Sequence, residues 1–300
     1  MAYKIRKAVF PVAGLGTRFL PVTKASPKEM LPIVDKPLIQ YAVEEAAAAG
    51  ITEMIFVTGR SKRAIEDHFD KAYELEAELA SHGKHEQLQE IQNLLPGEIR
   101  YTYVRQVEAL GLGHAVWCAR HLIGNEPFAV VLADDLIDAE VPALKQMAEL
   151  YEDHRCSIIG VQQIPRQETG QYGIVRPLPA GPRLHRIAQI VEKPAPADAP
   201  STLGVVGRYI FTPHIFDYLN EADPGHGGEI QLTDAVQKLI ERRPVLAYEF
   251  RGTRYDCGSK LGYVKATVAY GMKHRAIGDD FTRYLGGLSL PEESEERKTA

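Results

Sequence analysis

A glycine-rich segment near the start of the chain carries one arginine and is followed by a lysine. The segment reads Ala13-Gly14-Leu15-Gly16-Thr17-Arg18, and Lys28 lies in Pro27-Lys28-Glu29-Met30-Leu31-Pro32. Glycines let the backbone approach a phosphate or a base closely, and backbone amides there can point at anions. Arg18 offers a planar fork for phosphate oxygens, and Lys28 a compact ammonium. The pattern indicates a site for a phosphorylated ligand; the alternative is a tight turn with two surface cations.

Two familiar phosphate-binding motifs do not match this segment. The dinucleotide fingerprint needs a third glycine where Phe19 stands, and the Walker loop needs a Gly-Lys-Ser/Thr that is missing. A nicotinamide-dependent oxidoreductase and a P-loop enzyme are therefore both disfavoured.

Two acidic positions are candidate metal ligands. Asp134 and Asp135 follow the apolar run Phe128 to Leu132, and Asp256 lies far away in Tyr255-Asp256-Cys257-Gly258. A carboxylate at the carboxyl end of a parallel strand sits where α/β sheets bind ligands. Magnesium takes one or two carboxylates together with substrate phosphates. The residues alone leave the alternatives open: an acidic turn at Asp134 and a helix start at Asp256.

The elements that must position these residues alternate along the first half of the chain. Apolar runs predict strands, and a proline start with a glycine end predicts the helix from Pro37 to Gly50. The predicted strands are Lys7 to Val12, Glu53 to Thr58, Ile99 to Arg105 and Phe128 to Leu132; the other predicted helices are Ser61 to about Leu95, capped by Ser61 and broken near Gly83, and Gly113 to His121. This alternation predicts a parallel sheet with helices on both faces.

The second half is richer in strands. Strands are predicted at Ser157 to Gln163, Gly173 to Arg176, His185 to Val191 and Val205 to Phe211, and helices at Pro213 to Leu219, Leu232 to Arg242 and Lys260 to Lys273. We expect a single α/β domain over residues 1–275, with a nucleotide-binding half (1–156) and a more antiparallel second half (157–275) that share one Rossmann-like mixed, mostly parallel sheet. The segment 276–300 ends in a charged run, which we expect to be disordered.

Composition excludes several classes of protein. The chain of 300 residues has a formal net charge of −5 and 45% hydrophobic residues, without a long apolar run. The net charge argues against a nucleic-acid partner, and the hydropathy against a membrane partner or a signal peptide. Its 3 cysteines are scattered, which indicates neither disulfides nor a zinc site. We expect a cytoplasmic protein.

The chain resembles the sugar-1-phosphate nucleotidyltransferases over roughly residues 4 to 275. The resemblance rests on the run from Gly14 to Pro37 and on further motifs: Arg105-Gln106 with Gly111-Leu112-Gly113-His114-Ala115-Val116, Val191-Glu192-Lys193-Pro194, Gly228-Glu229-Ile230-Gln231-Leu232-Thr233-Asp234 and Asp256-Cys257-Gly258. It implies the family's nucleotidyltransferase fold, Mg2+ as cofactor, UTP and glucose 1-phosphate as substrates, and UDP-glucose and pyrophosphate as products. The expected macromolecular partner is another copy of the chain, in a dimer or tetramer.

The resemblance also implies a role for each site residue. Arg18, Lys28 and Lys193 would act on the phosphates, Asp134 and Asp256 would bind the metal, and Gly173, Glu192 and Lys193 would hold the sugar. Ala13, Gly14, Gly16, Thr17 and Gly111 would bind the nucleotide, with Gln106 and Glu29 as candidates for reading the base, because a side-chain amide can match the donor and acceptors of uracil. Ala133 departs from the family pattern, in which Pro or Gly is more common there.

Simpler alternatives stay open. Gln106 would otherwise be a solvated strand end, and Glu192 with Lys193 an exposed ion pair. A relative that uses dTTP or another sugar is the nearest alternative function. A non-catalytic regulatory protein that binds sugar nucleotides is another.

Overall fold

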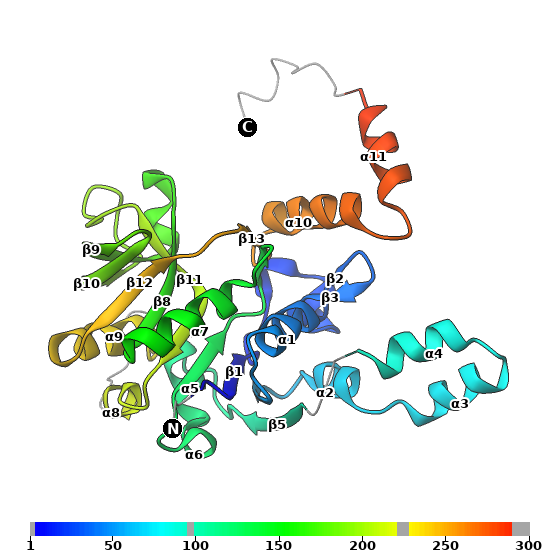
Figure 1. Ribbon diagram of the computed structural model, residues 1–300, viewed down its shortest axis with the longest axis horizontal. Coiled ribbons are helices and arrows are strands. Elements are labelled where there is room, and N and C mark those ends of the chain that lie inside the picture. The colour runs from blue at the N-terminus through cyan, green and yellow to red at the C-terminus, as the bar shows by residue number, and fades with distance from the viewer. Residues whose placement is uncertain (1–3, 95–98, 221–227, 290–300) are drawn as a thin grey trace.

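The computed structural model describes residues 4–94, 99–220 and 228–289. A nine-stranded sheet runs through the described chain in the order β5-β4-β1-β6-β11-β8-β12-β10-β9 (Figure 1). Its strands are β1 (Lys7–Pro11), β4 (Glu53–Thr58), β5 (Arg100–Arg105), β6 (Phe128–Val131), β8 (Ser157–Gln163), β9 (Gly173–Gly181), β10 (Leu184–Glu192), β11 (Leu203–Phe211) and β12 (Val245–Glu249). The predicted charged end beyond Pro291 lies outside the described residues.

The sheet is mixed, as predicted, but parallel pairing dominates only its first half. Strands β5, β4, β1 and β6 are parallel neighbours. Strand β11 then runs antiparallel to both β6 and β8, and β10 runs antiparallel to β9 and β12. The part of the prediction that made the whole sheet mostly parallel therefore holds only where strands alternate with helices.

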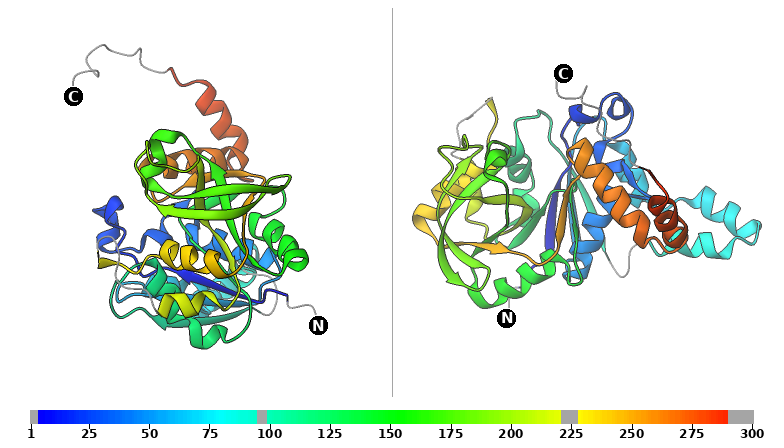
Figure 2. Two further views of the ribbon diagram at one scale, coloured as in Figure 1. Left: turned by 90° about the vertical axis from the view of Figure 1, so that its left-hand side faces the viewer. Right: turned by 90° about the horizontal axis from the view of Figure 1, so that it is seen from above.

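Helices cover both faces of the sheet (Figures 1 and 2). Side chains alternate along each strand, so Val9 of β1 joins a core with α5, α8 and α9, whereas Ala8 and Phe10 join a second core with α1 and α7. The helices are α1 (Leu38–Ala48), α2 (Arg63–Phe69), α3 (Tyr73–Ser81), α4 (His85–Gln92), α5 (Leu112–Cys118), α6 (Arg120–Ile123), α7 (Ala143–His154), α8 (Ile215–Asn220), α9 (Leu232–Arg242), α10 (Lys260–Lys273) and α11 (Gly278–Gly286).

The predicted long helix between Ser61 and Leu95 is three helices, and Leu95 lies outside the described residues. The break at Gly83 is present, but a second break before Tyr73 separates α2 from α3. The residue that caps α2 is Lys62 rather than Ser61. The three helices do not share one buried apolar face, because Leu75 is 48% exposed while Ile65 and Leu79 are buried.

Two short strands outside the main sheet carry Asp135 and Asp256, and Asp134 immediately precedes the first of them. Strand β7 (Asp135–Asp138) pairs antiparallel with β13 (Thr253–Asp256), and Asp135 lies opposite Asp256 in the register. Another two-stranded sheet, β2 (Pro32–Ile33) with β3 (Lys36–Pro37), follows the glycine-rich segment. The β7–β13 ribbon thus brings together residues more than a hundred positions apart in the sequence.

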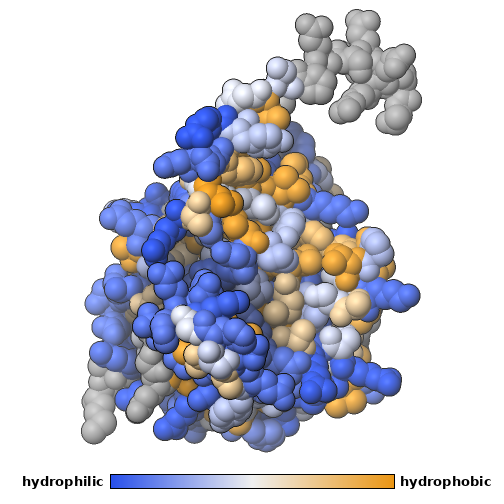
Figure 3. Space-filling view, turned by 90° about the vertical axis from the view of Figure 1, so that its right-hand side faces the viewer, coloured by the Kyte–Doolittle hydropathy of each residue, from blue (hydrophilic) through white to orange (hydrophobic). Residues whose placement is uncertain are grey.

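Apolar side chains are exposed on part of the surface. On the face shown in Figure 3, the arm formed by α3 and α4 is mainly hydrophilic, and apolar side chains gather above it towards α10 and α11. The exposed large hydrophobic residues of those two helices and their flanks are Leu261, Val264, Met272, Ile277, Tyr284 and Leu288. Within the described ranges, no helix has both the length and the apolar character that a membrane span requires. The predicted homo-oligomer stays a prediction.

Arg208 joins the sheet to α1 and to the loop that carries the acidic residues. Its side chain is buried, and its guanidinium donates to Glu45 Oε1 at 3.0 Å and to Glu45 Oε2 at 2.7 Å. It also donates to the carbonyl oxygens of Leu132 and Asp135 at 2.9 and 2.7 Å. One buried cation therefore fixes both ends of the turn between β6 and β7.

Replacing Arg208 should destabilise the fold strongly. Arg208→Met leaves the Glu45 carboxylate buried without its cation, and the expected loss in the free energy of unfolding is about 3–5 kcal/mol. Arg283→Met is the matched control, because Arg283 forms an exposed ion pair with Asp280 at 2.7 Å and should leave stability unchanged. Urea denaturation of both variants measures the effect. An Arg208→Met protein as stable as the parent would contradict this account.

Candidate active site

The glycine-rich segment lies at the carboxyl end of β1, beside the ends of its parallel neighbours. Its Ala13 carbonyl oxygen lies only 3.2 Å from where a Cβ would sit on Gly59, which follows β4. Gly14 faces open space, since a Cβ there would meet nothing within 4 Å. Thr17 begins the 3-10 turn η1 (Thr17–Phe19), which carries Arg18. This edge of a parallel sheet is where α/β folds bind ligands.

Gly16 brings Lys28 close to the same bend. Gly16 has a φ of 67°, and a Cβ on it would lie 3.2 Å from the Cβ of Lys28. Lys28, in the 3-10 turn η3 (Lys28–Met30), donates from Nζ to Asp134 Oδ2 at 2.6 Å. Burial alone would lower the pKa of Lys28, but the negative charges of Asp134 and Glu29 outweigh burial and raise it. Lys28 is therefore a cation at neutral pH, held against the acidic site.

Asp134, Asp256 and Arg18 face one small volume beside Gly258. A Cβ placed on Gly258 would lie 3.0 Å from Asp256 Oδ1, 3.1 Å from Asp134 Oδ2 and 3.7 Å from Arg18 Nη1. Burial alone would raise the pKa of Asp134. The ammonium of Lys28 outweighs burial and lowers this pKa below its ordinary value, so the carboxylate is ionised. The described residues contain no group of three or more His, Cys, Asp or Glu side chains arranged to hold a metal. Two facing carboxylates match the donor set that magnesium uses when phosphates complete its coordination.

Asp135 is separated from this pair by its own partners. Its Oδ1 accepts hydrogen bonds from Arg254, and its Oδ2 accepts one from the backbone N–H of Gly207 at 2.6 Å. Arg254 also donates to the hydroxyl of Tyr172 at 3.2 Å. Burial raises the pKa of Asp135. Both of its oxygens are occupied, so Asp135 holds the site together rather than facing the shared volume.

Gln106 and Gly111 organise the loop after β5. Gln106 is buried and donates from Nε2 to the Gly111 carbonyl oxygen at 3.1 Å. Gly111 has a φ of 96°, and a Cβ there would lie 2.8 Å from the Cβ of Glu229, so only glycine fits. The backbone N–H of Ile230 donates to the carbonyl oxygen of Leu110 at 2.8 Å. This hydrogen bond fixes the loop to the segment before α9.

Glu29 lies beneath this edge rather than on it. Its side chain is 1% exposed, and Glu29 Oε2 accepts from Lys62 Nζ at 2.8 Å. Burial raises the pKa of Glu29 although two lysines oppose that effect. The other oxygen, Oε1, is buried and has no hydrogen-bond partner in the described structure. The predicted contact of Glu29 with a base stays a prediction.

Gly173 and Glu192 lie opposite each other on β9 and β10, with Thr233 of α9 beside them. Thr233 Oγ1 donates to Glu192 Oε2 at 2.7 Å. A Cβ on Gly173 would lie 3.4 Å from both Glu192 Oε2 and Thr233 Oγ1, so the glycine leaves room in front of the carboxylate. Lys193 is half exposed, and its Nζ lies 3.3 Å from Glu192 Oε1.

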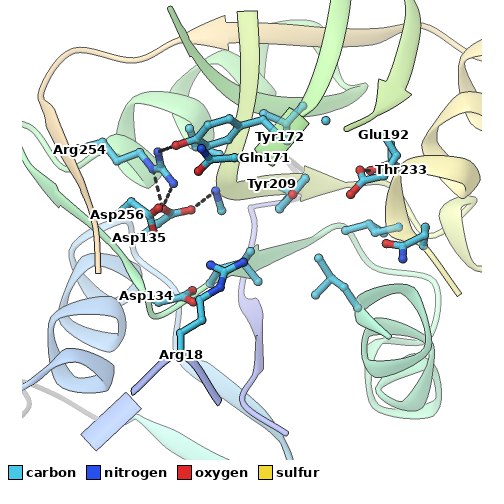
Figure 4. A pocket seen from close by; sticks show the side chains of 18 residues that line it. Arg18, Asp134, Asp135, Gln171, Tyr172, Glu192, Tyr209, Thr233, Arg254 and Asp256 are labelled. Carbon is cyan, nitrogen blue, oxygen red and sulfur yellow. Dashed lines mark hydrogen bonds and ion pairs between the residues drawn. The ribbon is translucent and has the colours of Figure 1, made fainter. Parts of the chain in front are cut away.

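One pocket joins the acidic residues to the β9–β10 wall (Figure 4). Arg18 and Asp134 approach it from one side, and Glu192 and Thr233 point into it from the other. The polar side chains and glycines that line it are Arg18, Asp134, Asp135, Gln171, Tyr172, Gly173, Glu192, Gly207, Tyr209, Gln231, Thr233, Arg254 and Asp256. Lys28 contacts this lining through Asp134, and Lys193 through Glu192.

Several residues of the site escaped sequence reasoning. Arg254, Tyr172 and Thr233 carry hydrogen bonds that hold the pocket walls, and Lys62 holds Glu29. One feature of the sequence could have pointed to Arg254. Residues two apart on a strand share a face, and Arg254 lies two positions before Asp256. Burial raises the pKa of the Cys257 thiol to about 12, so it stays protonated at neutral pH and is a packing residue, not a nucleophile.

Known proteins match the chain over most of its length. The family described as nucleotidyl transferase matches residues 7–272. A UTP–glucose-1-phosphate uridylyltransferase of Bacillus subtilis (strain 168) is 54% identical over 290 residues, which cover 97% of this chain and 99% of the relative.

Two solved structures share the fold. A UDP-glucose pyrophosphorylase complexed with UDP-glucose has a TM-score of 0.83 at 49% identity, covering 90% of this chain and 100% of that one. A UTP-bound UGPase from Acinetobacter baumannii has a TM-score of 0.88 at 42% identity, covering 95% of this chain and 100% of that one. Because both sequence and fold agree over nearly the whole chain, the protein belongs to the nucleotidyl transferase family.

Proposed function

We propose that this chain transfers a uridylyl group from UTP to glucose 1-phosphate, forming UDP-glucose and pyrophosphate. The observation that carries the proposal is one pocket with paired carboxylates and cations on one wall and Gly173 with Glu192 on the other. A phosphorylated nucleotide fits the first wall, and a hexose with its hydroxyls fits the second. The high identity to a UTP–glucose-1-phosphate uridylyltransferase supports the same substrates.

Asp134 and Asp256 are the residues that would hold Mg2+ in this chain. Their oxygens face the same volume beside Gly258, and both are carboxylates, the ligand type that magnesium prefers. When bound, the ion would neutralise phosphate charge and favour departure of the pyrophosphate. Asp135 is not in the set, because Arg254 and Gly207 occupy its oxygens.

The reaction needs positioning and charge neutralisation rather than a protein nucleophile. A phosphate oxygen of glucose 1-phosphate attacks the α-phosphorus of UTP, and the bond from that phosphorus to the oxygen bridging to the β-phosphorus breaks. A phosphate monoester has a second pKa near 6, so the attacking oxygen needs no base at neutral pH. Arg18 and Lys28 would neutralise the triphosphate and the leaving pyrophosphate, since Lys28 contacts Asp134 and Arg18 lies beside the same volume next to Gly258.

The remaining residues divide between the two ligands. Ala13, Gly14, Gly16, Thr17 and Gly111 would meet the nucleotide, and Gln106, which donates to the Gly111 carbonyl oxygen, would read the base. Gly173 and Glu192 would contact the sugar, and Lys193 its phosphate. Glu29 is kept as a candidate for reading the base, with its carboxylate held by Lys62.

Pyrophosphate release tests the proposed function. With Mg2+ and glucose 1-phosphate, UTP should give pyrophosphate, whereas ATP, GTP and CTP should give far less, and EDTA should abolish the signal. Comparable rates with dTTP would favour the relative with a broader base preference. A protein that binds UDP-glucose but releases no pyrophosphate would be the regulatory alternative and would overturn the proposal.

Replacing Lys193 should affect one substrate much more than the other. Lys193→Ala removes the cation proposed to hold the sugar phosphate, so KM for glucose 1-phosphate should rise about tenfold or more, as for a lost charged hydrogen bond. KM for UTP should change little, because Lys193 lies on the sugar side of the pocket. Steady-state kinetics with each substrate varied separately measures both values. An equal rise in the two KM values would refute the assigned role.

A further inference from the structure

Arg254 connects the two walls of the pocket. Strand β13 carries Arg254 two residues before Asp256, and the guanidinium donates both to Asp135 on β7 and to the hydroxyl of Tyr172, which immediately precedes β9. The guanidinium carbon also lies 5.2 Å from the centre of the Tyr172 ring. Figure 4 shows Arg254 between Asp135 and Tyr172 at the edge of the pocket. It is thus a direct side-chain contact between the acidic ribbon and the β9–β10 wall.

Tyr172 also contacts Lys193, through its backbone carbonyl oxygen. The backbone N–H of Lys193 donates to the Tyr172 carbonyl oxygen at 3.0 Å, and the next pair in the register is Gly173 opposite Glu192. Lys193 has a φ of 45°, a left-handed conformation that is uncommon for a residue other than glycine. Such a conformation persists only where its surroundings hold it. Tyr172 therefore holds the backbone of Lys193 through its carbonyl and is itself held by Arg254 through its hydroxyl.

The charge and the planar shape of the Arg254 side chain both suit its contacts with Asp135 and Tyr172. Asp135 would otherwise be a third carboxylate beside Asp134 and Asp256, in a pocket that must admit anionic phosphates. Two of the guanidinium nitrogens serve Asp135 and a third serves Tyr172. A lysine could neutralise Asp135, but its single nitrogen lacks the planar fork that spans both partners.

We propose that the Arg254–Tyr172 contact is a positioning element. It fixes the distance between two pairs of residues, Lys193 with Glu192 on one wall and Asp134 with Asp256 on the other. Neither Arg254 nor Tyr172 takes part in the chemistry; they fix the sugar 1-phosphate relative to the nucleotide. This inference rests on the proposed function of the same pocket. It predicts that weakening the contact impairs use of the sugar phosphate and spares UTP binding.

Tyr172→Phe is the sharpest test, because it removes only the hydroxyl. The expected result is a rise of about tenfold in KM for glucose 1-phosphate, with KM for UTP within about twofold of the parent. Tyr248→Phe is the matched control: Tyr248 also donates one hydrogen bond, to Gln146 at 3.2 Å, outside this pocket, and its loss should change neither value. Thermal unfolding should place both variants close to the parent.

A second variant tests the same contact by changing the arginine instead of the tyrosine. Arg254→Lys retains the charge beside Asp135 but loses the fork, so it should raise KM for glucose 1-phosphate as Tyr172→Phe does. The double variant should be no worse than the more impaired single variant, because both remove the same contact.

The outcomes separate the two proposals. If the parent protein makes UDP-glucose but both single variants match it, or if KM for UTP rises as much as KM for glucose 1-phosphate, the positioning role is wrong and the proposed function stands. Additive effects in the double variant would equally overturn the contact as their cause. A parent protein without uridylyl transfer would overturn the proposed function, and this inference with it.

Discussion

The site depends on pairing each buried carboxylate with its own cation. Asp134 is paired with Lys28, Asp135 with Arg254, Glu29 with Lys62 and Glu45 with Arg208. An unpaired carboxylate in a poorly hydrated interior is costly, and neighbouring carboxylates repel one another. The pairs let several acids crowd one edge of the sheet, where Asp134 and Asp256 face the volume beside Gly258. Because the cations come from distant parts of the chain, the same pairs also connect the ribbon, the sheet and α1.

This arrangement resolves the charge problem posed by an acidic protein with anionic substrates. The formal net charge of the chain is −5, yet Arg18 and Lys28 are concentrated at the carboxyl end of β1, where phosphates would lie. Arg254 cancels Asp135 at the same edge. The local field is thus set by a few fixed cations and the carboxylates of Asp134 and Asp256 rather than by the overall charge.

Sequence patterns predicted the regular elements best where periodicity and end signals agreed. The strand Glu53–Thr58 and the helices Leu232–Arg242 and Lys260–Lys273 have the predicted limits. The helix Ala143–His154 and the short strands β7, β12 and β13 were not foreseen; the three strands are only four or five residues long. The antiparallel character of the second half follows from its many strands with little helix between them, as predicted, but the order of those strands in the sheet is not encoded by periodicity.

The charged residues of the candidate site could be predicted from the sequence, whereas the residues that hold them in place could not. The structure brings Arg18, Lys28, Asp134 and Asp256 together, as their motifs led us to expect. Glu29 differs, because its motif position does not reveal that Lys62, thirty-three residues away, buries it. Contacts such as Arg254 to Tyr172, separated by 82 residues, are set by the tertiary fold alone.

The central claim is that Asp134 and Asp256, but not Asp135, bind the divalent ion that accompanies the nucleotide. Anomalous diffraction from crystals of the protein grown with Mn2+ and a non-reactive UTP analogue tests it most directly. The account predicts one manganese peak in contact with the carboxylates of Asp134 and Asp256 and a nucleotide phosphate, with the Asp135–Arg254 pair intact. A peak bound by Asp135, or one away from both Asp134 and Asp256, would contradict it.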